Sequence, residues 1–291
     1  MREDDPVFGP KILVRSLSEP GKPDERGNRW QYHSRSDRHS KIACWGILFD
    51  LMQNCPQLLT HIEQGRVVFG INHEMRDFKQ NRKKKLDLVL CTPGNAPTSA
   101  SKLPLSFRGL VEKWGIRLSP AERKALLSLP DVPAAPVGAV LVALEAKACM
   151  TAHLKALPRL YDELNSSHLT IHGSTDAAIA AGFVMVNVAD AFISPDENKV
   201  ALDTHAPKVS SHRQPECAQR AIDKVREIPR RAKTGEEGFD AVGIVAVSCR
   251  NDGSAIELVT ARPAPTASDI DSYDMMIRRI ALLYGTRFLH V

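Results

Sequence analysis

The fold is decided by the clearest predicted strand in the sequence, Val137-Gly-Ala-Val-Leu-Val-Ala-Leu-Glu-Ala-Lys147. It is apolar or small almost to its end, as expected for a central strand that is covered on both faces. An acid and a base, Glu145 and Lys147, then interrupt the apolar pattern. Side chains alternate along a strand, so we expect these two to share one face while Ala146 points to the other.

Other apolar runs around this strand predict the rest of a sheet. Short segments rich in Val, Ile and Leu indicate strands at residues 66–71, 86–91 and 181–188. A basic, polar connection over residues 76–85 joins the first two. An Asp-Gly pair at residues 252–253 separates two more apolar runs, at residues 240–248 and 254–261, which is typical of a hairpin.

Helical periodicity fills most of the segments between these strands. The predicted helices cover residues 37–65 (divided by Pro56), 106–129, 151–164 (kinked or restarted at Pro158), 215–228 and 269–284. Residues 92–104 and 194–214 are polar and predict loops. Strands that alternate with helices predict an α/β fold, with a central mixed sheet flanked by helices and a helical insertion at about residues 104–131.

The first 36 residues differ from the remainder in composition. They are rich in charge, Pro and Gly, with one apolar run at residues 11–15 that indicates a short strand or arm before a flexible lead-in. We therefore predict an N-terminal arm at residues 1–36 and one α/β domain at residues 37–291.

Composition bounds the class of protein. The chain has 291 residues, 43% of them hydrophobic, which is enough for a sizeable core, and a net charge of +5, which is compatible with a polyanionic partner without requiring one. Its six cysteines form no CxxC pair, which favours reduced thiols in a cytosolic protein. No signal-peptide run or membrane-length segment occurs, so we expect a cytoplasmic protein without a membrane partner. GxxxxGK[ST], GxGxxG and GxSxG are absent, which argues against a nucleotide cofactor and a serine hydrolase.

Three charged residues at strand positions carry the candidate chemistry. Asp87 lies near the start of the strand at residues 86–91, and Glu145 and Lys147 end the strand at residues 137–147. If the two strands are neighbours, both carboxylates can hold a hard divalent cation, with the Ala146 backbone carbonyl as a further ligand. Lys147 can then orient the attacking water or stabilise the charged transition state. The alternative is an ordinary strand end with solvated charges.

This pattern of Asp87 followed by Glu145-Ala-Lys147 after an N-terminal helix resembles the PD-(D/E)xK nuclease superfamily, over roughly residues 37–190. The resemblance implies a restriction-endonuclease-like core, Mg²⁺ (or Mn²⁺) as cofactor, and DNA phosphodiester hydrolysis that leaves a 5′-phosphate. It also implies a restriction or defence enzyme that works as a homodimer. Leu86 replaces the motif's proline, and the stretch between Asp87 and Glu145 is longer than the minimal core needs.

Further charged residues supply candidate contacts to DNA and metal. The basic run Arg82-Lys-Lys-Lys85 precedes Asp87, and Lys155 and Arg159 share a helix face beyond Lys147. Each set either contacts phosphates or is a solvated surface. The expected DNA-binding residues are Arg82, Lys83, Lys84, Lys85, Lys155 and Arg159. Glu74 is a candidate additional metal ligand, with balance of the basic run as its alternative role. His168 and His172 invite a zinc interpretation, but we expect them in a loop.

Two other classes of function fit the same sequence. The acids could be vestigial on a nucleic-acid-binding module that does not cut its ligand. Alternatively, the helical insertion and the last helix could form the interface of an oligomeric interaction protein. Divalent-metal binding that depends on Asp87 distinguishes the enzyme from a binding module that does not cut. Salt-sensitive nucleic-acid binding distinguishes the enzyme from an oligomeric interaction protein.

Overall fold

A six-stranded mixed sheet forms the centre of the computed structural model, which describes residues 7–95 and 105–291. The strand order is β1-β2-β3-β4-β7-β8; β1, β2 and β3 are antiparallel, β3, β4 and β7 are parallel, and β8 returns antiparallel to β7. The strands are β1 (Val68–Asp77), β2 (Arg82–Pro93), β3 (Val137–Cys149), β4 (Ile179–Asn187), β7 (Ala241–Ser248) and β8 (Glu257–Val259). The predicted α/β class, with helices flanking a mixed sheet, is confirmed.

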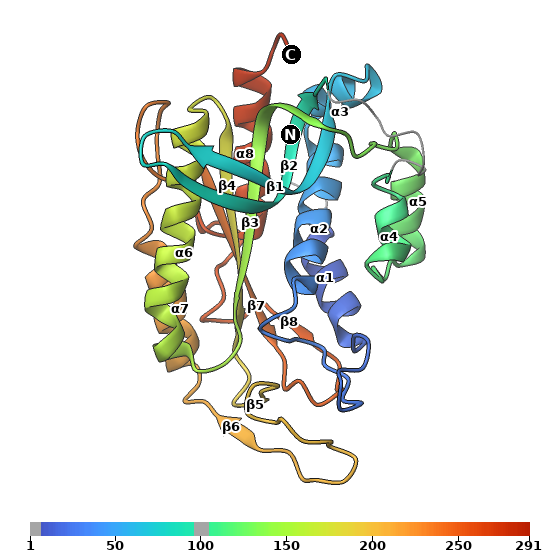
Figure 1. Ribbon diagram of the computed structural model, residues 1–291, viewed down its shortest axis with the longest axis vertical. Helices are drawn as coiled ribbons and strands as arrows, with labels where there is room; N and C mark the ends of the chain where they lie inside the picture. The colour runs from blue at the N-terminus through green and yellow to red at the C-terminus, as the bar shows by residue number, and fades with distance from the viewer. Residues whose placement is uncertain (1–6, 96–104) are drawn as a thin grey trace.

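Helices cover both faces of this sheet (Figure 1). One face packs against α1 (Gly9–Ser18), α2 (Arg38–Asn54), α3 (Pro56–Glu63) and α8 (Tyr273–Arg287). The other packs against α6 (His153–Ser174) and α7 (Glu216–Arg226). All nine residues of β4 are buried, as expected for the strand between the two layers. A small ribbon of β5 (Ala191–Ile193) and β6 (Val209–Ser211) lies at the bottom of Figure 1.

The N-terminal segment departs from the prediction of a strand at residues 11–15. Residues 9–18 form α1 instead, with Pro10 in the first turn and Ile12, Leu13 and Leu17 buried against the core. A short apolar run does not distinguish a strand from a buried helix. Helix α1 crosses α2 closely, because a Cβ on Gly46 would lie 2.9 Å from the Cα of Gly9.

The connection predicted at residues 76–85 is also wrong, because most of it belongs to a long hairpin. Strand β1 runs to Asp77 and β2 begins at Arg82, with a turn between them at residues 78–81. Glu74 pairs with Lys85 across the strands and its carboxylate lies 2.9 Å from the Lys83 ammonium. Cross-strand pairing of opposite charges lets this polar segment remain extended.

Two helices of the chain differ from their predicted extents. The insertion contains α4 (Gly109–Lys113) and α5 (Pro120–Ser128) rather than one helix, because Gly115 adopts a positive φ and Ser119 forms a capping box that starts α5. Helix α6 continues through Pro158 to Ser174. The predicted loop at residues 92–104 begins only after Pro93, and its residues 96–104 lie outside the described residues.

The remaining expectations concern cysteines and membranes. All six cysteines are free, and all but Cys217 are buried, as predicted for reduced thiols. Of the helices that the structure describes, none has the length and apolar character needed to cross a bilayer.

A buried carboxylate, Asp50 of α2, joins three helices on one face of the sheet. Its Oδ1 accepts a hydrogen bond from the Phe8 N–H at 2.8 Å, and its Oδ2 accepts from the Gly9 N–H and the Tyr273 hydroxyl, both at 2.8 Å. The Asp50 side chain therefore satisfies the start of α1 and fixes α8 against α2. Because α2 also carries the N-terminal turn that faces β2 and β3, this joint positions one wall of the candidate site.

Replacement of Asp50 by alanine should lower the free energy of unfolding by on the order of 3 kcal/mol, because it leaves two backbone N–H groups and one hydroxyl without their acceptor. Urea denaturation measures the change. The exposed acid Asp203 offers a control, and Asp203→Ala should change the value by less than about 0.5 kcal/mol. Equal effects of the two substitutions would rule out the proposed role of Asp50.

Candidate functional site

The pairing of β2 with β3 brings the two predicted acids together. Leu88, Val89 and Leu90 pair with Leu144, Ala143 and Val142 in an antiparallel ladder. Asp87 and Glu145 each lie one residue beyond the Leu88–Leu144 pair, on neighbouring strands, and they are close enough for the Asp87 charge to raise the pKa of Glu145. The condition on which the prediction depends, that the two strands are neighbours, is therefore met.

Asp87 lies where the backbone ladder between β2 and β3 ends. Its Oδ2 accepts a hydrogen bond from the Ala146 N–H at 2.9 Å, so the side chain replaces the missing strand partner. Burial raises the pKa of Asp87, while the Ala146 N–H, the Ser40 hydroxyl and the Lys147 ammonium partly offset that rise. Asp87 is therefore held in place from β3, beside the start of α2.

Glu145 is the most buried acid of the site, with 2% of its surface exposed. Its Oε1 lies 2.7 Å from the Lys147 Nζ and 3.7 Å from the Lys84 Nζ. Its Oε2 is buried and has no hydrogen-bond partner among the described residues. Burial raises the pKa of Glu145 above its ordinary value, and the ammonium groups of Lys147 and Lys84 offset only part of that rise. One carboxylate oxygen is thus held by cations, and the other is left available for a ligand.

Lys147 is held as a cation between two carboxylates. Its Nζ contacts Glu145 and also lies 3.3 Å from the Oε2 of Glu163 on α6. Burial lowers the pKa of Lys147, but Glu145 and Glu163 raise it more, so the net shift is upward. The amine therefore carries its charge at neutral pH and is suited to bind an anionic group, not to act as a base.

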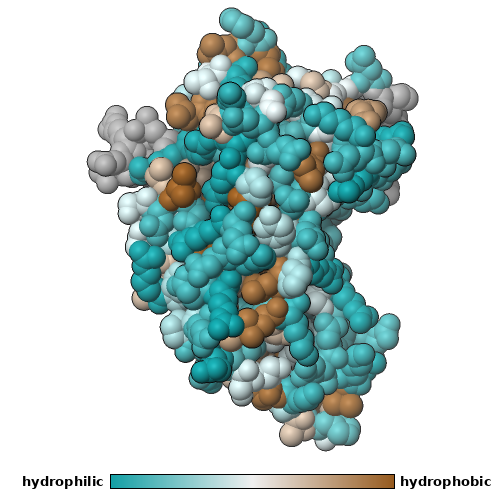
Figure 2. Space-filling model, turned by 90° about the vertical axis from the view of Figure 1, so that its left-hand side faces the viewer, coloured by the Kyte–Doolittle hydropathy of each residue, from teal (hydrophilic) through white to brown (hydrophobic). Residues whose placement is uncertain are grey.

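Asp87, Lys147 and Glu163 line a cleft of about 420 Å³ that we call the central cleft, and the buried Glu145 lies behind Lys147, outside the lining residues. Asp87 and Lys147 lie in it, and its walls come from the segment before α2, from β3 and from α6. Figure 2 shows the molecule hollowed along its right-hand edge. The lining residues are Tyr32, Ser34, Arg35, Ser36, Asp37, His39, Ser40, Asp87, Ala146, Lys147, Ala148, Cys149, Met150, Thr151, Ala156, Arg159, Leu160 and Glu163.

The donors of the central cleft suit a hard divalent cation bound by few protein ligands. Within residues 7–95 and 105–291, no group of three or more His, Cys, Asp and Glu side chains could hold a metal ion. Two carboxylates on neighbouring strands are present, however, and the buried Glu145 Oε2 has no partner in the part of the chain that the structure describes. Mg²⁺ is typically held by one or two carboxylates and completes its shell with water and substrate oxygens, so the residues fit that cation. The role of the Ala146 carbonyl stays a prediction.

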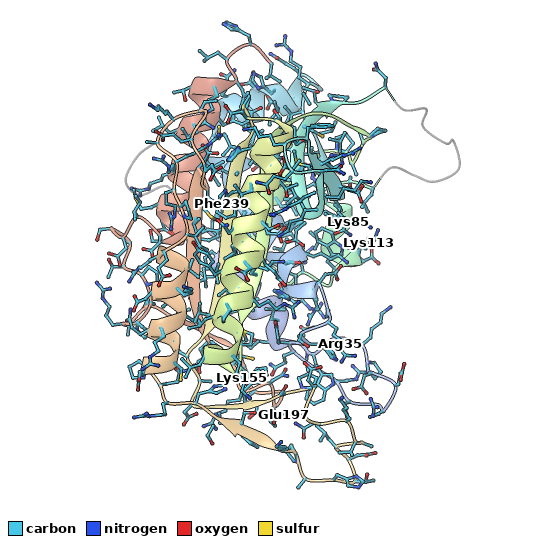
Figure 3. All side chains as sticks on the ribbon, turned by 60° about the vertical axis from the view of Figure 1, so that its left-hand side comes forward. Arg35, Lys85, Lys113, Lys155, Glu197 and Phe239 are labelled. Carbon is cyan, nitrogen blue, oxygen red and sulfur yellow. The ribbon has the colours of Figure 1, made fainter. Side chains whose placement is uncertain are left out.

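The predicted basic residues separate into different environments. Arg159 lines the central cleft, and Lys84 points inward, where its Nζ donates to the Glu163 backbone carbonyl and lies near Glu145. The others are exposed outside the residues that line the cleft: Arg82, Lys83 and Lys85 on β2, and Lys155 in the first turn of α6. Figure 3 labels Lys85 and Lys155 in these places.

The candidate ligand Glu74 does not lie with the other acids. It is on β1, its side chain is 46% exposed, and it binds Lys83. Its alternative role, balancing the basic run, agrees with this contact. Asp87 and Glu145 are therefore the predicted acids that the structure brings together.

His168 and His172 lie in α6, so the expectation of loop histidines is wrong. The apolar repeat of Leu160, Leu164 and Ile171 continues helically past Leu164 and includes His168. The His168 Nε2 bonds to Asn165 at 2.8 Å, and the His172 Nε2 bonds to the Gly238 carbonyl at 3.0 Å. Burial lowers the pKa of each to about 4. Each ring thus has its own protein partner in the core.

Sequence reasoning missed several residues of the cleft. Glu163 had a local signal, since it lies four residues after Arg159 on α6 and binds it at 2.6 Å. Tyr32, Arg35 and His39 had none, because they come from a segment that joins the cleft only through the tertiary fold.

Comparisons of this chain with protein-family models, curated proteins and solved structures find no match. The PD-(D/E)xK resemblance therefore rests on the pattern of motif residues in the sequence. Any inference about function depends on the geometry of Asp87, Glu145 and Lys147 at the central cleft.

Substitution of Lys147 by methionine should destabilise the metal-free protein by roughly 2–4 kcal/mol at pH 8, because it leaves the buried Glu145 carboxylate with only the more distant Lys84. The loss should shrink toward pH 4.5. Without Lys147 the pKa of Glu145 rises further, so the folded protein binds the proton more tightly than the unfolded chain, and stability falls as pH rises.

The double variant Glu145→Gln with Lys147→Met should recover most of this stability and lose the extra pH dependence, because it removes the unpaired charge. Urea denaturation in EDTA at pH 4.5 and pH 8 measures both effects. A loss that is independent of pH, or that the second substitution does not relieve, would mean that Lys147 does not neutralise Glu145.

Proposed function

We propose that this chain is a metal-dependent endonuclease of the PD-(D/E)xK type that hydrolyses phosphodiester bonds of DNA. The observation that carries the proposal is the buried cluster of Asp87, Glu145 and Lys147, in which one carboxylate oxygen has no partner among the described residues. A buried, perturbed acid that lies in a cleft beside a fixed cation is a feature of functional sites. Two carboxylates and an amine in this arrangement fit metal-dependent hydrolysis better than they fit a purely structural role.

Asp87 and Glu145 would hold Mg²⁺ between the opposed strands β2 and β3. When bound there, Mg²⁺ supplies Lewis-acid chemistry that activates water and offsets charge on the phosphodiester. Asp87 is preorganised for this task by the Ala146 N–H, and Glu145 by Lys147. Neither side chain needs to be drawn from solvent, so little ordering entropy opposes binding.

Lys147 would bind a non-bridging oxygen of the scissile phosphate or the attacking water. Its ammonium is charged and is fixed by carboxylates on two sides, Glu145 from β3 and Glu163 from α6. Fixed donors aimed at developing negative charge stabilise a transition state without reorganisation. Glu163 acts as a positioning residue, because it holds both Lys147 and Arg159.

Exposed cations around the central cleft support an anionic, polymeric substrate. Arg159 and Arg35 line the cleft with side chains that are 85% and 77% exposed. In Figure 3, Lys85 and Lys113 lie above Arg35 on the same edge of the molecule. Cations on both sides of a cleft attract a phosphate backbone by a salt-dependent, sequence-independent attraction.

The arrangement of elements agrees with the fold that the resemblance implies. From α2 the chain order is two helices (α2, α3), three antiparallel strands (β1, β2, β3), a helix (α6) and a strand parallel to β3 (β4), with α4 and α5 inserted between β2 and β3. This agreement is an analogy of fold, and it raises the expectation of a restriction-endonuclease-like core without specifying a reaction.

Incubation of the protein with plasmid and oligonucleotide duplexes and Mg²⁺ tests the proposal. Cleavage is expected, and Asp87→Asn, Glu145→Gln and Lys147→Ala should each lower its rate by at least about 100-fold, since each removes a ligand or the fixed cation. Gel electrophoresis of time courses measures the rate.

Glu74→Gln is the matched control, because it removes an acid that lies on the neighbouring strand outside the central cleft. It should cut at close to the wild-type rate. Failure of the wild-type protein to cut any nucleic acid with Mg²⁺ or Mn²⁺, or equal loss in Glu74→Gln and Lys147→Ala, would contradict the proposal.

A further inference from the structure

A second cavity, of about 360 Å³, adjoins the central cleft. We call it the side cavity. The two hollows share four lining residues, namely Tyr32, Arg35, Ser36 and His39. The two hollows are therefore adjacent, and the volume of the side cavity lies within the range of small-molecule sites.

Aromatic rings form much of the side cavity's wall. Tyr32 and His39 pack with their ring centroids 5.1 Å apart, and Trp30 is fixed by a 2.8 Å hydrogen bond from its Nε1 to Asp24. Burial, aided by the nearby Lys147, lowers the pKa of His39 to about 4, so its ring is neutral at physiological pH. Neutral aromatic rings offer faces on which a planar base can stack.

Cations lie at the rim of the side cavity. Lys22 and Arg35 are exposed there, and Arg35 has a weak 3.5 Å contact with Asp196. Arg38, in contrast, is committed to the fold, because its guanidinium donates to the Ser16 and Glu19 carbonyls. The side cavity thus combines apolar planar walls with two cations that can approach phosphates.

The protein core fixes the wall between the two hollows. The Asn251 Oδ1 accepts hydrogen bonds from the Gln31 and Tyr32 N–H groups, at 3.0 and 2.9 Å. The Gln31 side chain donates to the Ser18 and Ser254 carbonyls. Because this segment is held in place, the side cavity is a preformed site.

We infer that the side cavity binds an unpaired nucleobase of the strand whose phosphate enters the central cleft. This inference rests on the proposed nuclease function. The base would stack against the aromatic wall, while Arg35, common to both hollows, would contact the connecting phosphate. A base inside a duplex reaches such a site only after unstacking and unpairing, which is least costly where the base is already unpaired. The substrate class is therefore DNA with single-stranded or mismatched nucleotides at the cut.

Binding in EDTA tests the inference without catalysis. The probe is a single strand of about 20 nucleotides that carries 2-aminopurine, long enough to span several stacking sites, compared with the blunt duplex of the same sequence. The wild-type protein should bind the single strand at least about 10-fold more tightly than the duplex, and 2-aminopurine fluorescence should fall on stacking. Arg35→Ala, which alters an exposed side chain, should weaken single-strand binding roughly 3- to 10-fold.

Gly21→Phe provides a second variant that adds bulk at the side cavity. Gly21 lines it, and a Cβ there would meet the Trp30 carbonyl oxygen at an ordinary 3.5 Å. The variant should lose the preference for the single strand and retain duplex binding. Gly285→Phe, at a helical position with no atom within 4 Å of an added Cβ, should behave as the wild type.

The outcomes separate this inference from the proposed function. Mg²⁺-dependent cleavage of DNA with no preference for unpaired nucleotides, or unchanged single-strand binding by both Gly21→Phe and Arg35→Ala, would overturn the side cavity's role and leave the nuclease intact. Absence of binding to either probe, together with absence of cleavage, would overturn both.

Discussion

The register between β2 and β3 is the constraint on which the candidate site depends. Leu88 pairs with Leu144, so Asp87 and Glu145 lie beside each other's strand just beyond the last pair of this ladder. A slip of one residue would turn one acid to the opposite face, because side chains alternate with a period of two. Close packing on both faces of β2 and β3 opposes such a slip, since it would move each side chain from one core to the other, among neighbours that it does not fit.

The same burial makes the charged side chains of the site energetically costly. Glu145 ends an apolar strand and is almost completely buried, where an ionised carboxylate is costly unless cations compensate it. Lys147 and Lys84 supply that compensation for one oxygen only. A buried ion pair is weak evidence for stability, and an apolar replacement is often as stable. Breaches of local folding rules are expected at functional sites, and we interpret this cluster in that way.

Much of the sheet, and the placement of Asp87 and Lys147 at one cleft, could be predicted from the sequence, because strong apolar runs and side-chain alternation are local signals. The remainder depends on tertiary context. Residues 11–15 form part of a helix because Asp50, Gly46 and Tyr273 offer a surface that fits α1, and none of these is near in sequence. Residues 1–36 were predicted to be an arm, yet their last part and the start of α2 form a wall of the central cleft. Pairing across β1 and β2 keeps residues 82–85 extended, a result that composition alone did not indicate.

Titration of the protein with Mn²⁺, followed by electron paramagnetic resonance of the free ion, tests the central claim that Asp87 and Glu145 act on one cation. We predict one binding site in the wild-type protein, weakened at least about 10-fold by either Asp87→Asn or Glu145→Gln and retained in Lys147→Met, because the carboxylates are the ligands. Binding that is unchanged in both acid variants, or absent from the wild-type protein in the presence of DNA as well as in its absence, would contradict that claim.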